Sequence, residues 1–360
     1  MVREEIQVAN VSYVQVMDKD GNVDKEEFPN IEEDKIKEMY HLMKLLRALD
    51  EKLFALQRSG KIGTYAQTKG QEASQIGSGF VLKEEDWFVP SFRELGVYIC
   101  RGIDRGKLVQ VWNGDTRAFA DVEKTHSTPV SIPIASQLLH ATGIAWGSKY
   151  NEKEEATIVY FGEGATAEGD FHEALNFAAV LNLPVVFFCQ RNQWSISTPY
   201  EKESSTKTIA EKAVAYGIEG VQVDGNDVLG VYKVTEDALN KARDGNGPTL
   251  IEAVTYRMGD HTTSDDSSKY RSEEEIKEWE SKCPLLRLEK YFQSIGTWND
   301  DYKRWVEETV QKEVEEAVEK GFNVEPPKPE QMFEDVYIEK PEILKEQEKE
   351  LKEELGGSEK

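Results

Sequence analysis

The sequence predicts an α/β protein with a doubly wound parallel sheet that is flanked by helices. Three observations support this prediction. Strand-like apolar runs alternate with helix-like segments from residue 156 to residue 258. Two of the runs, 158–162 and 184–189, are separated by a segment long enough for one crossover helix, 170–182. Both runs end in polar residues, and the ends of strands are where open parallel sheets hold ligands.

The segment before the main domain, residues 1–35, is predicted to be an N-terminal arm. Its strand-favouring residues lead into a polar turn at 18–22, which is typical of a short hairpin. The α/β domain itself is predicted over 36–322. It opens with a helix at 36–56, because apolar residues recur there at helical spacing and form one buried stripe.

The other elements follow from the same periodicities. They are, in order, a helix opening at 70–74, a strand at 87–89, a polar loop at 112–133, a helix at 134–149, a helix at 208–216, a strand at 220–223, a helix ending at 243 and a strand at 249–256. Beyond the sheet, the pattern of residues 273–320 predicts a C-terminal helical region. Residues 323–360 are predicted to form a charged tail. Two interpretations of the tail stay open, a solvated helix and an arm that binds a partner.

Two polar residues follow neighbouring strands of the predicted sheet. Glu163 comes after the first strand and Asn192 after the second, and the crossover returns the chain to the same sheet edge. Mg²⁺ prefers such hard oxygens and completes its octahedron with phosphate oxygens and water. The glycines beside Glu163, Gly162 and Gly164, leave room for a diphosphate near a helix start. The plain alternative is a turn glycine beside a surface acid.

Composition narrows the classes of function. Acidic residues outnumber basic ones by 68 to 44, and the net charge of −24 argues against binding of nucleic acid or anionic membranes. The three cysteines are widely spaced and odd in number, which favours reduced thiols. The start of the chain lacks the pattern of an export signal, and no stretch reaches membrane-spanning length. We therefore expect a cytoplasmic protein.

The stretch from Glu163 to Asn192 resembles the thiamine-diphosphate motif, which begins with Gly-Asp-Gly and ends with Asn-Asn; the interval here is 29 residues. More closely, the chain from about residue 15 to 348 resembles the alpha subunit of the decarboxylating first component of 2-oxo acid dehydrogenase complexes, the pyruvate and branched-chain enzymes. Two residues depart from the general motif. Glu163 replaces the aspartate, as in the branched-chain branch, and Arg191 replaces the first asparagine, with an open role.

The resemblance implies a thiamine-diphosphate-binding fold, with Mg²⁺ and, as a further candidate, K⁺. The implied metal ligands are Glu163, Asn192 and the carbonyl of Trp194. The implied cofactor-binding residues are Phe92, Arg93, Ile134, Gly162, Glu163, Gly164, Ala165, Asn192, Ser195 and His261. Four residues match a monovalent-cation site of branched-chain relatives, although such oxygen-bearing residues are common at helix starts: Ser131, Pro133, Ser136 and Gln137.

His261 is the one distinctive member of the hydrophilic loop 258–271, and it lies just past a strand on the same sheet edge as Glu163. A histidine there can bind diphosphate as a cation or assist proton transfer, although a lone histidine is more often structural. The resemblance implies a catalytic role. It also implies that Ile134 lies beneath the thiamine; the alternative is an ordinary core isoleucine. Thr262 lies at the position of a serine that is phosphorylated in mitochondrial relatives.

The chain lacks an obvious carboxylate for the aminopyrimidine end of the cofactor. The resemblance implies that a separate beta subunit supplies it in an alpha2beta2 assembly, which acts on a 2-oxo acid substrate and passes the acyl group to the lipoyl group of a dihydrolipoyl acyltransferase. The choice between pyruvate and branched-chain 2-oxo acids stays open. Two alternatives are an acetoin dehydrogenase alpha subunit and a non-catalytic module that binds phosphate or nucleotide and assembles through acidic helices.

Overall fold

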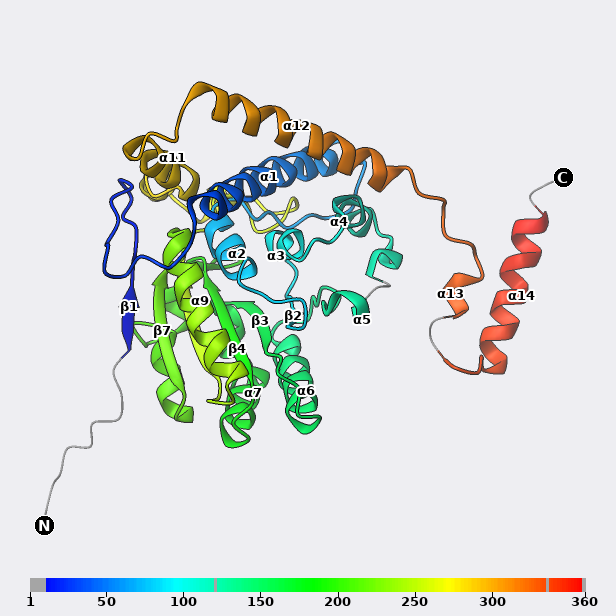
Figure 1. Cartoon of the computed structure of the whole chain (residues 1–360). Coiled ribbons are helices and arrows are strands. Elements are labelled where there is room, and N and C mark those ends of the chain that lie inside the picture. The colour runs from blue at the N-terminus through cyan, green and yellow to red at the C-terminus, as the bar shows by residue number, and fades with distance from the viewer. Residues whose placement is uncertain (1–10, 120–121, 335–336, 358–360) are drawn as a thin grey trace, which may run out of the picture.

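The computed structural model describes residues 11–119, 122–334 and 337–357 (Figure 1). Its centre is a six-stranded sheet in which every pair of neighbours is parallel, in the order β1-β7-β8-β4-β3-β2. The predicted parallel sheet is therefore confirmed. The strands are β1 (Ser12–Val14), β2 (Trp87–Val89), β3 (Thr157–Gly162), β4 (Val185–Arg191), β7 (Glu219–Asp224) and β8 (Thr249–Val254), beside a small antiparallel pair, β5 (Trp194–Ser195) and β6 (Thr198–Pro199).

The central strands are buried on both faces, as parallel strands covered by helices must be. In β3, Ile158 and Tyr160 belong to one core cluster, whereas Val159 and Phe161 belong to the other. This alternation follows from the two-residue period of a strand. Helices α6 (Ser136–Tyr150) and α7 (Gly169–Val180) contribute to the second cluster, and α2 (Glu72–Gly79) and α9 (Val228–Arg243) contribute to the first.

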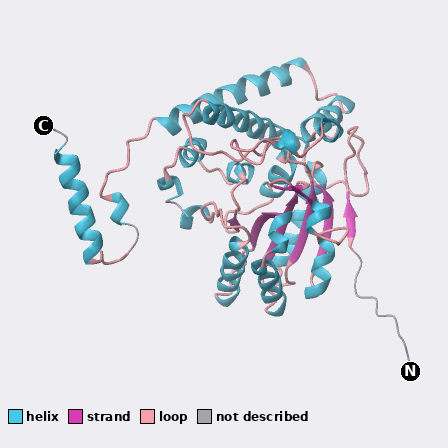
Figure 2. Ribbon diagram, turned by 180° about the vertical axis from the view of Figure 1, so that it is seen from behind, coloured by secondary structure: helices cyan, strands magenta, loops and turns pink. Residues whose placement is uncertain are grey.

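The helices are α1 (Glu33–Arg58), α2 (Glu72–Gly79), α3 (Leu95–Cys100), α4 (Arg105–Trp112), α5 (Val122–Thr125), α6 (Ser136–Tyr150), α7 (Gly169–Val180), α8 (Tyr200–Glu203), α9 (Val228–Arg243), α10 (Glu273–Glu280), α11 (Pro284–Ser294), α12 (Asp300–Phe322), α13 (Gln331–Glu334) and α14 (Glu342–Gly357). Some helices cover the faces of the sheet, whereas α1 and α12 lie beyond one end of it and α13 and α14 stand to the side (Figures 1 and 2). Short 3₁₀ turns occur at 116–119, 163–167, 210–216 and 267–269. None of the described helices is long and apolar enough to cross a membrane.

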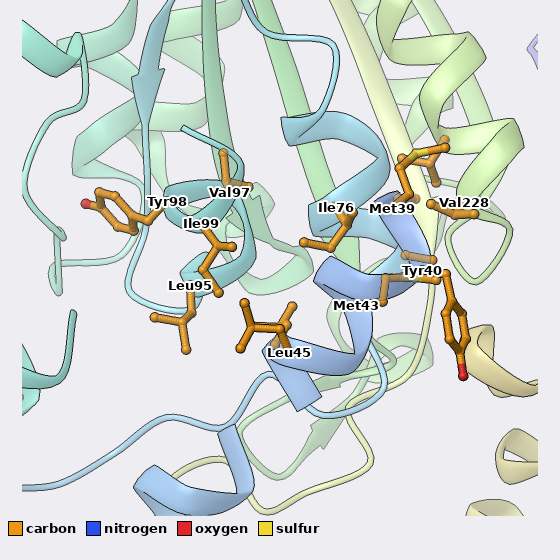
Figure 3. Close-up of a cluster of buried hydrophobic side chains, with 14 of the residues drawn as sticks. Met39, Tyr40, Met43, Leu45, Ile76, Leu95, Val97, Tyr98, Ile99 and Val228 are labelled. Carbon is orange, nitrogen blue, oxygen red and sulfur yellow. The ribbon is translucent and has the colours of Figure 1, made fainter. Parts of the chain in front are cut away.

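The long helix α1 shows how sequence pattern becomes packing. Met39 and Leu45 of the predicted stripe, together with Met43, are fully buried, and they belong to the same core cluster as Ile76 of α2 and Val228 at the start of α9 (Figure 3). Burying each such side chain contributes about 1.5–3 kcal/mol. The stripe therefore packs α1 against the other helices, α2 and α3 among them.

The segment before α1 is connected to the sheet more closely than the sequence indicated. Strand β1 pairs with β7 at the sheet edge, and Met17 forms an antiparallel bridge with Val23 that closes the predicted turn. Buried Asp227, at the start of α9, accepts hydrogen bonds from the amides of Val16 (2.6 Å) and Met17 (2.8 Å). The first ten residues of the predicted arm lie outside the described residues, and the division at 35 and 322 stays a prediction.

Two local predictions were wrong in detail. The stretch 112–133, expected as a loop, contains the 3₁₀ turn at 116–119 and the short helix α5. The helix expected at 208–216 is a 3₁₀ segment, 210–216. Both segments are short, and hydrophobic periodicity over a few residues does not separate loops, 3₁₀ turns and helices.

Candidate active site

A cavity of about 380 Å³ lies at the carboxyl ends of β3, β4 and β8. Register explains why: Gly162 pairs with Gln190, so the residues that follow both strands leave the sheet at the same edge. Every residue that the sequence analysis named for the cofactor and the metal lines this one cavity, namely Phe92, Arg93, Ile134, Gly162, Glu163, Gly164, Ala165, Asn192, Trp194, Ser195 and His261. Their individual roles stay predictions.

Glu163 begins the turn after β3 and is 2% exposed. Its Oε2 accepts a hydrogen bond from the backbone amide of Asn192 at 3.2 Å, whereas its Oε1 is buried without a partner. Burial raises the pKa of the Glu163 carboxyl to about 7, because the charged form is poorly solvated there. The cavity thus holds a buried carboxylate oxygen that is free to bind a cation.

Asn192 and Trp194 stand beside this carboxylate. The Asn192 side chain donates to Oε1 of Gln71 at 3.2 Å and accepts from the amide of Trp194 at 3.4 Å. The carbonyl of Trp194 accepts from Arg257 at 2.9 Å, and its indole donates to Glu275 at 2.8 Å. These contacts hold the amide oxygen and the carbonyl at the same cavity wall.

His261 lies between two buried guanidinium groups. Its Nδ1 is 3.3 Å from Arg93 and 3.4 Å from Arg257, and Arg93 also donates to the His261 carbonyl at 3.0 Å. Burial first, and then the two cations, lower the pKa of His261 to about 3. Because both neighbours can only donate, Nδ1 acts as the acceptor and Nε2 carries the proton. The lowered pKa favours a neutral His261 in the cofactor-free chain near neutral pH, and the role of His261 toward a diphosphate stays a prediction.

The loop that carries His261 is held by its own network. The backbone amide of His261 donates to Asp265 at 2.8 Å, and Asp265 also accepts from the hydroxyl of Tyr270. That hydroxyl in turn accepts from Arg257 at 3.2 Å. Neighbouring Thr262 accepts from the amide of Ser264 at 3.3 Å. A histidine in a hydrophilic loop is thereby fixed against the cavity.

The residues present fit a magnesium–diphosphate group. The donor set combines a carboxylate, an amide oxygen and a carbonyl, which are the hard ligands that Mg²⁺ takes. A Cβ added at Gly162 would meet no atom within 4 Å, so the turn leaves open space beside Glu163. Arg93 and Arg257 face the same cavity as positive charges. The described residues contain no group of three or more His, Cys, Asp or Glu side chains placed to hold a metal.

The start of α6 brings together the residues proposed for a monovalent cation. The hydroxyls of Ser131 and Ser136 are 2.8 Å apart, and Ser136 donates to the carbonyl of Pro133 at 2.8 Å. Gln137 instead turns its amide to the carbonyl of Tyr160 at 2.9 Å and faces the cavity. Three of the four residues are therefore adjacent, and the fourth lies on the other side of the helix start.

Ile134 is at the cavity rim and is 51% exposed, so it is not an ordinary core isoleucine. The next residue, Ala135, is fully buried and has a φ of 67°, a left-handed conformation that is rare for a residue with a Cβ. Such strain persists only where the surroundings enforce it. The backbone turn at Ala135 is what presents Ile134 to the cavity rather than to the core.

Comparison with known proteins identifies the family of this chain. The model of the family described as the dehydrogenase E1 component matches residues 40–330. The chain belongs to this family.

Two kinds of relative in the E1 family are similar over nearly the whole chain. The 3-methyl-2-oxobutanoate dehydrogenase subunit alpha of Mycobacterium tuberculosis (strain ATCC 25618 / H37Rv) is 40% identical over 95% of this chain and 94% of its own length. The pyruvate dehydrogenase E1 component subunit alpha of Acholeplasma laidlawii is 41% identical over 94% of this chain and 99% of its own length. The subunit of the same name from Staphylococcus aureus (strain N315) is 37% identical over 93% of this chain and 91% of its own length. The predicted family and fold are confirmed, and membership implies the use of thiamine diphosphate.

Sequence reasoning missed several cavity residues of this E1 chain, among them Arg257, Gln71 and Glu203. Arg257 directly follows the segment 249–256 that was read as a strand, so the strand-end rule could have found it. Gln71 and Glu203 come from the start of α2 and the end of α8, and no local pattern marks them. The unexplained Arg191 does not line the cavity. It donates to the buried carboxylate of Glu252 at 2.9 Å.

Proposed function

We propose that this E1 chain is the alpha subunit of a 2-oxo acid dehydrogenase that uses thiamine diphosphate and Mg²⁺ to decarboxylate pyruvate or a branched-chain 2-oxo acid. One observation supports this above others. Buried Glu163, with one unpartnered oxygen, is hydrogen-bonded to Asn192 at the carboxyl ends of two neighbouring parallel strands. This arrangement suits a metal that binds a diphosphate, and the relatives' names point to 2-oxo acids as substrates.

The protein's task is to bind and orient, because the cofactor, when bound, supplies the stabilisation of the carbanion left after carbon dioxide departs. Glu163, Asn192 and the Trp194 carbonyl would hold Mg²⁺, and Arg93 would neutralise the diphosphate. His261 would donate from Nε2 as a neutral imidazole toward the reacting region. The exposed rim residue Ile134 would support the thiamine and, once covered, keep water out.

The site needs a second chain to be complete. The relatives are named subunit alpha, which supports a beta partner, and this cavity opens beside Ile134 and Ile196, which are 51% and 55% exposed. We propose that the beta subunit covers this rim in an alpha2beta2 assembly and supplies the carboxylate for the aminopyrimidine. The acyl group would then pass to the lipoyl group of a dihydrolipoyl acyltransferase.

Two finer points of this proposal rest on fewer contacts. The adjacent oxygens of Ser131, Pro133 and Ser136 support a K⁺ site at the start of α6. A cytoplasmic location is supported by the free thiols of Cys100 and Cys189. A K⁺ titration of the thermal unfolding midpoint, with Na⁺ as the control, tests the first point.

Reconstitution with the beta subunit of the same organism tests the function. Decarboxylation of pyruvate and of 3-methyl-2-oxobutanoate, and cleavage of acetoin, would be compared by assays with an artificial electron acceptor. We expect turnover of at least one 2-oxo acid, and weak cofactor binding by the isolated chain. Tight binding of a phosphate ligand by the isolated chain, with no turnover beside any beta subunit, would instead support the non-catalytic binding module. Turnover of acetoin alone would support the acetoin enzyme.

A further inference from the structure

A buried carboxylate behind the cavity has no part in the function proposed above. Asp50 lies on α1 and is fully buried, and it is not among the residues that line the cavity. Its Oδ1 accepts hydrogen bonds from the hydroxyl of Tyr65 and from the amide of Thr68, both at 2.6 Å, and its Oδ2 accepts from the side chain of Gln67 at 3.5 Å. All three partners donate, so the arrangement suits an ionised carboxylate. Because a buried charge is costly, Asp50 needs an explanation beyond packing.

The three donors belong to one segment, 65–70, which runs beside the loop that carries His261. The backbone amide of Tyr65 donates to the hydroxyl of Thr263 at 3.1 Å, and the amide of Thr263 donates back to the carbonyl of Tyr65 at 3.0 Å. Further along, the amide of Met258 donates to the carbonyl of Lys69 at 2.9 Å. Segment 65–70 is therefore tied to this loop on both sides of His261.

The same segment also holds Arg93, whose guanidinium faces the cavity. One terminal nitrogen of Arg93 donates to the carbonyl of Gln67, and the other donates to the carbonyl of His261 at 3.0 Å. Both acceptors are neutral. Burial lowers the pKa of Arg93 to about 10, and Asp50 is among the carboxylates that oppose this shift. Asp50 thus supplies negative charge behind a buried cation and anchors the segment that fixes it.

We propose that Asp50 is a positioning residue for diphosphate binding, and that it acts through segment 65–70 on Arg93 and on the loop of His261. This inference rests on the proposed function, because it takes the diphosphate of the cofactor as the ligand of Arg93. Asp50 itself does not touch the ligand. It holds two cavity groups in place before the ligand arrives, and groups that are already ordered bind more tightly because no ordering cost falls on the binding step.

Asp50→Asn in the full-length chain, assembled with its beta subunit, tests the proposal. We expect the affinity for thiamine diphosphate with Mg²⁺, measured by calorimetry, to fall by about tenfold, since one hydrogen bond to a charged group contributes about that much. The matched control is Asp86→Asn. Asp86 is also fully buried, and it accepts from the amide of Ala156 at 3.0 Å and pairs with Arg243 at the amino ends of β2 and β3, away from the cavity. This control should lose stability in urea unfolding and still bind the cofactor normally.

A double-mutant cycle separates positioning from stability. Arg93→Gln removes the guanidinium. If Asp50 acts through Arg93, adding Asp50→Asn to this variant should weaken cofactor binding by no more than about twofold further, because the effects of coupled residues do not add. Additive losses would overturn the proposal, as would normal affinity in Asp50→Asn alone or an equal loss in the Asp86→Asn control.

A measurement without cofactor makes the test independent of the proposed function. Nδ1 of His261 lies 3.3 Å from Arg93, so its NMR signal in the cofactor-free chain should shift in Asp50→Asn in the direction seen in Arg93→Gln. This shift in a protein that binds no thiamine diphosphate would count against the proposed function alone. If Asp50→Asn does not fold, Tyr65→Phe removes one bond to the carboxylate and should shift the signal the same way by less. An unchanged signal in the variant that folds would overturn the positioning role.

Discussion

The backbone amide of Asn192 donates a hydrogen bond to Oε2 of Glu163 across 3.2 Å, although the two residues are 29 positions apart. The bond joins the ends of two parallel strands at the sheet edge that forms the cavity. It occupies one carboxylate oxygen and leaves the other without a partner. A buried charge that lacks a partner is costly, so this carboxylate should depend on a bound cation.

Replacing Glu163 by Gln keeps the side-chain volume and removes the charge. We expect Mg²⁺-dependent binding of thiamine diphosphate to weaken by about 100-fold or more, because the only acidic ligand of the predicted set is lost. Calorimetry with and without Mg²⁺ measures this. The control Glu173→Gln lies on the exposed side of α7 and should bind normally. Equal metal affinity of the two variants would rule out Glu163 as a ligand.

Metal binding should also depend on pH, because burial raises the pKa of Glu163 to about 7. Below that pH the metal must displace a proton, so its affinity should fall by about tenfold per unit. Since the folded-state pKa is raised, this group stabilises the metal-free protein below its unfolded pKa of about 4.3, and that contribution is lost as the pH rises through 7. Calorimetry in buffers of different ionisation enthalpy would count the released proton. A flat profile from pH 6 to 8 would contradict the expectation.

His261 should remain neutral in the cofactor-free protein down to pH about 3. Its lowered pKa means that the unfolded chain binds a proton first, so the contribution of His261 to stability is full above pH about 6.5 and is lost as the pH falls. Imidazole NMR signals of the five histidines would report the titration. Arg257→Met removes one of the two cations and should raise the pKa of His261. No change in this variant would show that Arg257 does not contribute to the lowered pKa.

Gly164→Ala tests the close approach of two cavity segments. A Cβ at Gly164 would lie 2.6 Å from Oγ of Ser195, so the turn or the serine must shift. We expect weaker cofactor binding by about tenfold, and recovery in the double variant Gly164→Ala/Ser195→Gly, where the clash is gone. Gly162→Ala is the matched control for stability, because a Cβ there meets no protein atom within 4 Å. An additive double variant would refute the clash.

Asp227→Ala tests how the N-terminal segment is attached. Asp227 accepts from the amides of Val16 and Met17 and caps α9 through the amide of Leu229 at 3.1 Å. Loss of the cap costs about 1 kcal/mol, and each buried amide left unpaired costs about 1–3 kcal/mol. Urea unfolding should show a loss of about 3 kcal/mol or more. Hydrogen exchange at residues 12–17 should rise at the same time, and unchanged exchange would place the effect in α9 alone.

Much of the fold could be predicted because its signals are local. Buried parallel strands such as β3 and β4 are continuous apolar runs, and the stripe of α1 has helical period. The loop at 112–133 and the segment at 208–216 were misread, because a few residues do not distinguish 3₁₀ turns from loops or helices. Strand β1 was read as part of an arm, because a three-residue edge strand has too few side chains to indicate its partner.

The sequence by itself determined that an acid and an amide end neighbouring strands, since topology and hand return a crossover to one sheet edge. Only the tertiary structure placed Arg257, Gln71 and Glu203 in the same cavity, and only it showed that burial and then two guanidiniums lower the pKa of His261. The physical reason is the distance along the chain over which each effect acts. Strand ends follow from periodicity within a few residues, whereas burial and charge depend on side chains brought together from distant parts of the chain.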